Sequence, residues 1–121
     1  PKIIAVNYPG LESSDFYHLA KKQFNGAAGG VISFELGDKK EAFNFINSLC
    51  LIKRATNIND NKSLIIHPAS TIFADFSDEE KETMGVTDRL VRLSVGIEDV
   101  RDLTDDIHQA LMSRSPGQCK K

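Results

Sequence analysis

The chain has 121 residues, of which 15 are basic and 17 are acidic, so its formal net charge at neutral pH is -2. This length supports one domain with a modest core, and the balanced charge argues against a nucleic-acid partner. The sequence holds no apolar run long enough to cross a membrane and no secretory signal pattern at its start. We therefore expect a cytoplasmic protein without a membrane partner.

The first half of the chain carries helix and strand patterns in turn. Apolar residues at helical spacing predict a helix over residues 16–24, with polar capping candidates at residues 13–15. Side chains over residues 31–36 alternate in the way that predicts a strand. Asp38 and Glu41 then form a capping-box pattern, which opens a second amphipathic helix.

The second half begins with two candidate short strands, which are residues 51–55 and the apolar, β-rich residues 63–67. Ser77 and Glu80 form a second capping-box pattern, and Gly85 is expected to end the short helix that follows.

A strand over residues 90–95 and a helix over residues 100–112 complete the expected elements, with Glu98 and Asp99 placed to complement the start of that helix. Helices and strands that mix without strict alternation predict an α+β fold, with a small antiparallel-rich sheet and helices packed on one side. We expect residues 1–112 to form the domain and residues 113–121 to form a flexible tail.

Arg92 is the most informative residue of the chain, because it stands inside an otherwise apolar strand pattern. It shares one strand face with Leu90 and Ser94, whereas the residues between them point to the other face. One interpretation is that its guanidinium holds a carboxylate or phosphate. The other is an exposed arginine on a solvated sheet face, and spacing alone is more typical of this second interpretation.

Other candidate sites are weaker. The glycines within residues 26–30 lack the spacing of a phosphate-binding loop, and the three histidines lack metal-ligand spacing. For His67, beside a proline, a structural role is favoured over proton transfer. The acidic run over residues 75–82 is interpreted as a solvated helix start. Cys50 and Cys119 have no metal or redox spacing, and Cys50 is expected to be a small core residue.

Four ordered blocks carry a resemblance to a known family. They are Tyr8-Pro9-Gly10-Leu11, Gly29 to Phe34, Ser63 to Thr71, and Arg92 to Asp99. On these blocks the chain resembles the C-terminal domain of the Cys/Met-metabolism family of pyridoxal-phosphate enzymes. Within that family it is most similar to O-acetylhomoserine sulfhydrylases, because residues 57–60 and 85–87 are typical of them. Asn59 departs from this pattern, because it replaces a glycine. Asparagine tolerates the left-handed backbone conformation better than most residues.

The resemblance implies site residues and chemistry. It implies that Arg92 holds the α-carboxylate of an amino-acid substrate and that Asn57 makes a supporting contact. The parent transferase would exchange acetate on the γ-carbon of O-acetylhomoserine for sulfide or methanethiol, with pyridoxal phosphate as cofactor, and would assemble as a homotetramer. No lysine of this chain falls in the motif that binds the cofactor, so the chain alone is expected to hold no catalytic residue and to be inactive.

Two classes of hypothesis stay open. The chain is either the small domain of such an enzyme, completed by a large catalytic domain of the same polypeptide, or a stand-alone module that binds small carboxylates. Within the enzyme class, methionine γ-lyase or cystathionine γ-synthase is the alternative activity. The chain starts abruptly with an apolar run over residues 2–6, which suggests a partner upstream. An exposed apolar surface there would favour the enzyme domain, and a closed polar one the module.

Overall fold

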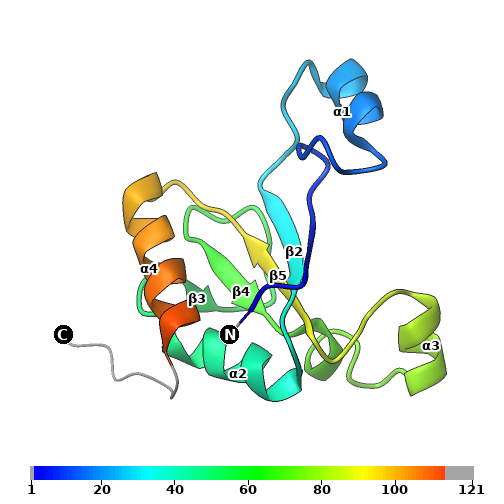
Figure 1. Ribbon diagram of the computed structural model, residues 1–121, viewed down its shortest axis with the longest axis vertical. Helices are drawn as coiled ribbons and strands as arrows, with labels where there is room; N and C mark the ends of the chain where they lie inside the picture. The colour runs from blue at the N-terminus through cyan, green and yellow to red at the C-terminus, as the bar shows by residue number, and fades with distance from the viewer. Residues whose placement is uncertain (1, 114–121) are drawn as a thin grey trace.

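A five-stranded mixed sheet forms the centre of the computed structural model, which describes residues 2–113 (Figure 1). The β1–β2, β2–β5 and β4–β5 pairs are antiparallel, and β3–β4 is parallel, so the expected antiparallel-rich sheet is present. The flexible tail expected for residues 113–121 lies outside the described residues except for Ser113. In spatial order the strands are β1 (Ala5–Asn7), β2 (Val31–Glu35), β5 (Leu90–Ser94), β4 (Leu64–Ile66) and β3 (Lys53–Arg54).

Two of the four α-helices cover one face of the sheet, and the other two lie beyond its ends (Figure 1). The expectation that helices pack on one side is therefore correct for α2 and α4 and wrong for α1 and α3. α1 buries only Ala20, and α3 buries no residue. The helical segments are α1 (Tyr17–Phe24), α2 (Lys39–Ser48), the 3-10 turn η1 (Pro68–Ser70), α3 (Asp78–Thr83) and α4 (Val100–Met112).

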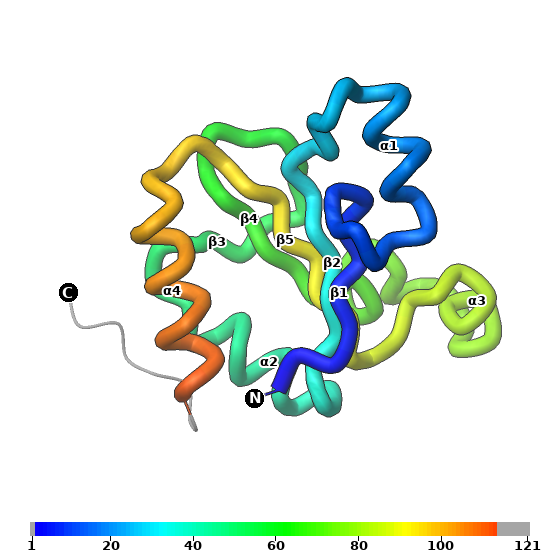
Figure 2. Tube along the Cα trace, turned by 45° about the horizontal axis from the view of Figure 1, so that its top comes forward, coloured from blue at the N-terminus to red at the C-terminus, as the bar shows by residue number. Residues whose placement is uncertain are grey.

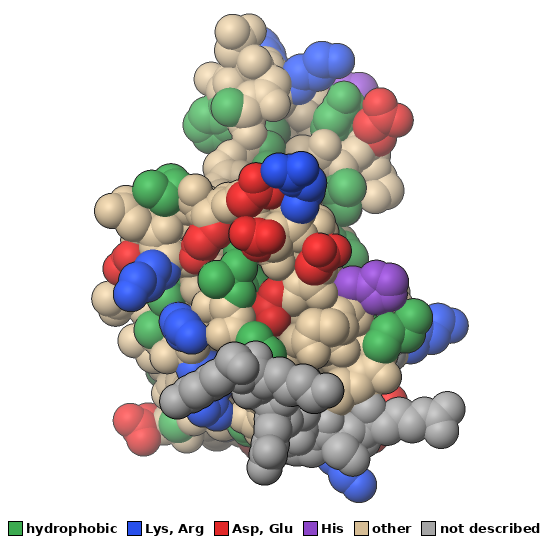
Figure 3. All heavy atoms as spheres, turned by 90° about the vertical axis from the view of Figure 1, so that its left-hand side faces the viewer, with side chains coloured by type: hydrophobic (Ala, Val, Ile, Leu, Met, Phe, Trp, Pro, Cys, Tyr) green, Lys and Arg blue, Asp and Glu red, His purple; other side chains and the backbone are tan. Residues whose placement is uncertain are grey.

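The core lies between the sheet and the helix pair α2 and α4. Val91 and Leu93 of β5 are buried there, as the alternation along that strand predicts. Phe34 of β2 lies opposite Val91, and its ring meets that of Phe45 from α2 edge to face at 5.6 Å. The outward side of the molecule where α4 lies carries interspersed acidic and basic side chains (Figure 3). Arg92 lies between Val91 and Leu93 in β5 and points to the opposite face of the sheet.

Local capping signals place two helices correctly. The Asp38 carboxylate accepts a hydrogen bond from the Glu41 N–H at 2.7 Å, although Glu41 returns its own side chain to Gly37 instead of Asp38. Ser77 and Glu80 form a complete capping box at the start of α3. The prediction of an N-cap at residues 13–15 is wrong. These residues form consecutive turns, and the N-cap position of α1 is Phe16, whose side chain makes no capping hydrogen bond.

The candidate strand over residues 51–55 is shorter than predicted, since only Lys53 and Arg54 pair with β4. The cause is Asp106 of α4, whose carboxylate accepts the N–H groups of Cys50, Leu51 and Ile52 at 2.8 to 3.0 Å. These residues turn around that carboxylate instead of joining the sheet. Cys50 is consequently exposed, which corrects its expected place in the core.

The N-terminal apolar run is a strand that the sequence did not reveal. β1 pairs with β2 through Ala5 to Asn7 and forms one edge of the sheet (Figure 2). Ile4 and Val6 remain about half exposed, at 53% and 46%.

Among the described residues, no helix is long and apolar enough to cross a bilayer.

Candidate functional site

Arg92 occupies the middle of the central strand, on the face of the sheet that α2 and α4 do not cover. It lies opposite Ser33 of β2 and Ile66 of β4. Its Nη2 donates hydrogen bonds to the backbone carbonyls of Thr56 at 2.7 Å and Asn57 at 3.3 Å. The guanidinium is therefore held at one nitrogen by the connection between β3 and β4.

The remaining donors of Arg92 are not used by the described residues. Its Nε is buried and has no hydrogen-bond partner there, and no described carboxylate forms a salt bridge with it. An unpartnered buried donor costs about 1 to 3 kcal/mol. Desolvation also lowers the pKa of Arg92 from its usual value, although arginine remains charged at neutral pH. This half-buried cation therefore has a planar set of donors suited to a carboxylate or phosphate.

Asn57 lies beside Arg92. It is exposed, and the contact with Arg92 is made by its backbone carbonyl. The structure brings the two residues together through the main chain, and a contact of the Asn57 side chain with a ligand stays a prediction.

Ser94 fixes the connection that holds Arg92. Its hydroxyl is buried and accepts a hydrogen bond from the Asn59 N–H at 3.1 Å. Asn59 adopts the left-handed conformation, with φ at 56°, so the turn tolerates asparagine where a glycine was expected. Sequence reasoning placed Ser94 on the face of Arg92 but gave it no role. A hydroxyl on a strand face next to a charge was the available signal.

Glu98 fixes the far end of the same connection. Its carboxylate accepts the Ser63 N–H at 2.6 Å and the Ser63 hydroxyl at 2.8 Å, and that hydroxyl accepts the Gly96 N–H at 2.8 Å. Burial acts to raise the pKa of Glu98, but the hydrogen bonds, chiefly from Ser63, and the charge of Lys62 outweigh burial and lower this pKa.

The expected role of Glu98 at the start of α4 is therefore wrong. Asp99 alone caps the helix, by accepting the Arg101 N–H at 2.8 Å. The Glu98 carboxylate points instead to the connection between β3 and β4, where it accepts hydrogen bonds from the N–H and the hydroxyl of Ser63.

His67 has the structural role that was favoured. It is buried, its ring lies 4.7 Å from that of Phe43, and its Nδ1 lies 2.8 Å from the Ser70 hydroxyl. Its Nε2 lies 2.8 Å from the carbonyl of Asp88. Because a carbonyl only accepts, Nε2 carries a proton, and the ring is fixed between two segments of the chain.

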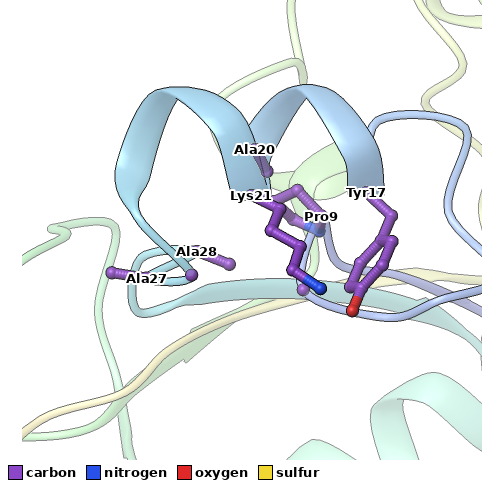
Figure 4. A pocket seen from close by; sticks show the side chains of 8 residues that line it. Pro9, Tyr17, Ala20, Lys21, Ala27 and Ala28 are labelled. Carbon is purple, nitrogen blue, oxygen red and sulfur yellow. The ribbon is translucent and has the colours of Figure 1, made fainter.

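The remaining candidates are a metal site and the cavity beside α1. Among residues 2–113, no group of three acidic, histidine or cysteine side chains is arranged to hold a metal ion. A cavity of about 150 Å³ lies under α1, where Lys21 and Tyr17 line it together with Pro9, Ala20, Ala27 and Ala28 (Figure 4). The Lys21 ammonium lies 5.6 Å from the centre of the Tyr17 ring.

The sequence is similar to those of known proteins. The pattern of one family, described as Cys/Met metabolism PLP-dependent enzyme, matches residues 1–112. The chain is 45% identical over 112 residues to an L-methionine gamma-lyase of Fusobacterium nucleatum, covering 92% of this chain and 28% of that protein. It is 43% identical over 112 residues to O-acetyl-L-homoserine sulfhydrylase 1 of Thermus thermophilus, covering 92% of this chain and 27% of that protein.

Solved structures share the fold. A putative O-acetylhomoserine (thiol)-lyase from Campylobacter jejuni, crystallised with N'-pyridoxyl-lysine-5'-monophosphate, matches with a TM-score of 0.86 at 43% identity, over 93% of this chain and 27% of its own. Cystathionine gamma-lyase from yeast matches with a TM-score of 0.87 at 41% identity, over 91% of this chain and 28% of its own. The chain thus spans little more than a quarter of the length of these relatives. With its whole described fold matched, the chain belongs to the Cys/Met metabolism PLP-dependent enzyme family, whose cofactor is pyridoxal phosphate.

Proposed function

We propose that this chain is the substrate-binding C-terminal domain of a fold-type I pyridoxal-phosphate enzyme, and that Arg92 holds the α-carboxylate of its amino-acid substrate. The observation that carries the proposal is a half-buried guanidinium that has no carboxylate partner among residues 2–113. Elsewhere in the described chain, Arg89 and Arg101 each pair with a carboxylate of the domain itself. Arg92 is instead held by backbone carbonyls, which orient it without neutralising its charge.

The described residues do not fit the cofactor itself. Pyridoxal phosphate requires a lysine for a Schiff base, a cradle for its phosphate and a partner for its ring nitrogen. Lys21 is the lysine that lines the cavity under α1, but that cavity is small for a cofactor and no acidic residue lines it. We therefore propose that a large domain of the same polypeptide binds the cofactor.

The exposed apolar surface supports a domain over a stand-alone module. Ile4 and Val6 at the sheet edge are about half exposed, and so are Phe16, Leu19 and Phe24 around α1. Apolar side chains exposed in this number are typical of surfaces that another protein segment covers. We propose that the large domain and further copies of the same polypeptide, in a homotetramer, cover them.

For the activity, we propose O-acetylhomoserine sulfhydrylase chemistry, in which acetate on the γ-carbon is replaced by sulfide or methanethiol. The support is the similarity of residues 57–60 to the sulfhydrylases, since these residues belong to the connection between β3 and β4 from which Thr56 and Asn57 hold Arg92. Methionine γ-lyase is the alternative, because a relative with that name is as similar to the chain as a sulfhydrylase. Arg92 has the same task in both, since a carboxylate anchor serves replacement and elimination alike.

The test uses the full-length polypeptide that contains this chain, purified with pyridoxal phosphate. Arg92→Ala is expected to raise KM for the amino-acid substrate, since loss of one member of a buried charge pair costs about 2 to 5 kcal/mol. Arg101→Ala is the matched control, because Arg101 is exposed on α4 and pairs with Asp99. Unchanged KM and kcat in Arg92→Ala would contradict the proposal.

The same enzyme separates the two activities. Homocysteine formed from O-acetylhomoserine and sulfide supports the sulfhydrylase. Methanethiol and an oxoacid released from methionine alone support the lyase. An enzyme that performs neither reaction, while Arg92→Ala still loses affinity for the amino acid, would retain the site and refute both activities.

A further inference from the structure

We infer that Ser94 and Glu98 are positioning residues for the carboxylate anchor, because they hold the connection over residues 55–63 in the form that orients Arg92. This inference rests on the proposed function of Arg92. Neither side chain touches the ligand in this scheme. Both act through the backbone carbonyls of Thr56 and Asn57, which accept the hydrogen bonds of Arg92 Nη2.

The Ser94 contact lies in the middle of the connection. Arg92 and Ser94 lie on the same face of β5, two residues apart, which is about 6.6 Å along a strand. The Ser94 hydroxyl accepts the Asn59 N–H, only two residues beyond the Asn57 carbonyl that Arg92 uses. One strand therefore holds both the guanidinium and the turn that orients it.

The Glu98 contacts lie at the end of the connection. Glu98 holds the Ser63 N–H and hydroxyl, and the Ile97 N–H donates to the Asn61 carbonyl at 3.0 Å. The close approach requires a glycine at position 96, because a Cβ there would lie 2.5 Å from the Asn61 carbonyl oxygen. The segment after β5 is thus fitted against the end of the connection.

The arrangement has a directional consequence for binding. If the turn at Asn59 is released, the Thr56 and Asn57 carbonyls lose their fixed positions, and Arg92 Nη2 loses its two acceptors. The guanidinium then samples several orientations, and binding a carboxylate requires one of them to be selected. Lost orientation of this kind weakens binding of the substrate in ground state and transition state alike, so it raises KM and leaves kcat unchanged.

The first experiment uses Ser94→Ala in the full-length holoenzyme. We expect KM for the amino-acid substrate to rise about 3- to 10-fold, the effect of one buried hydrogen bond, with kcat unchanged. The Kd of glycine, which has no γ-carbon to react, is expected to rise by the same factor in titration calorimetry. Ser48→Ala is the matched control, because its hydroxyl is equally buried but donates to the Asn44 carbonyl within α2.

The second experiment is a double-mutant cycle with Arg92→Lys, which keeps the charge but loses the planar guanidinium. If Ser94 acts through the orientation of Arg92, then Ser94→Ala has no further effect on the Kd of glycine in that background. An equal rise in both backgrounds would overturn the inference, because Ser94 would then act on binding without Arg92.

Glu98→Gln provides an independent variant if Ser94→Ala does not fold. Its amide faces the Ser63 hydroxyl with a donor in place of an acceptor, so the end of the connection loosens and the Kd of glycine is expected to rise. If both variants bind glycine normally while Arg92→Ala does not, the inference fails and the proposed function stands. If Arg92→Ala also binds normally, the proposed function fails.

Discussion

The two sides of the sheet each carry a charged residue, Asp106 and Arg92, and the two residues differ in how far the fold supplies their hydrogen-bond partners. On the helix-covered side, Asp106 of α4 accepts three backbone N–H groups and the Gln109 amide, and it is only 6% exposed. On the other side, Arg92 keeps a buried Nε without a partner in the described chain. The hydrogen bonds of Asp106 are made within the fold, whereas Arg92 keeps a donor that a ligand could use, which is the role we propose for it.

The largest expected effect on stability is at Asp106, whose hydrogen bonds are made within the fold. Asp106→Ala leaves the N–H groups of Cys50, Leu51 and Ile52 without their acceptor, and we expect the free energy of unfolding to fall by about 3 kcal/mol. Urea unfolding of the purified chain measures it. Asp105→Ala is the matched control, because the neighbouring Asp105 is exposed. Equal stability of the two variants would contradict the structural role of Asp106.

A smaller effect is expected at Gly96, in the segment that follows β5. Gly96→Ala places a Cβ 2.5 Å from the Asn61 carbonyl oxygen, so backbone must move, and we expect a loss of about 2 kcal/mol. Gly30→Ala is the control, since its Cβ would lie 3.4 Å from the Val95 carbonyl oxygen, an ordinary contact. Thermal unfolding of the two variants measures the difference. If Gly30→Ala is the more damaging, the fit between Gly96 and residues 61–62 is wrong.

Acid should remove the contribution of Glu98. Its pKa is lowered in the fold, chiefly by Ser63 against the opposing effect of burial, so its stabilisation is present above the unfolded pKa of about 4.3 and is lost as pH falls through the folded value. Wild type is expected to be more stable than Glu98→Gln near neutral pH, and the difference should shrink on acidification. Thermal unfolding across the pH range measures it. A constant difference at every pH would contradict the assignment.

Local patterns predicted the elements that position the site. Alternation along β5 predicted that Arg92 lies on the other face of the strand from Val91 and Leu93, and periodicity along α4 predicted which side of that helix is buried. Both predictions depend only on residues close in the chain. The Ser94 contact with Asn59 joins residues 35 apart, so no local pattern reveals it. Asp106 did leave a signal. It falls between Leu103 and Ala110 on the buried stripe, where an acid needs partners.

The contacts of β1 were missed for a related reason. An apolar run of five residues predicts burial but not a partner, and its pairing with β2 depends on a strand 26 positions away, as in Asn7 with Ser33. The prediction that Cys50 lies in the core was wrong, because its backbone N–H is held by the Asp106 carboxylate in a turn where the residue is exposed. In both cases the deciding interaction is distant in sequence. Arg92, by contrast, was singled out because it breaks an apolar strand pattern within a few positions, and the role proposed for it came from the family resemblance.

The smallest expected effect on stability sharpens the comparison most. Arg92→Met removes a half-buried charge whose Nε has no partner in the described chain and keeps the apolar stem, so the free energy of unfolding should change by less than about 1 kcal/mol or rise. Urea unfolding of the chain measures stability, and glycine binding by the full-length holoenzyme measures function. We expect Arg92→Met to lose glycine binding and to keep its stability, whereas Asp106→Ala is expected to lose stability. A large loss of stability in Arg92→Met would mean that its two hydrogen bonds to the connection hold the fold together, and Arg92 would then belong with Asp106.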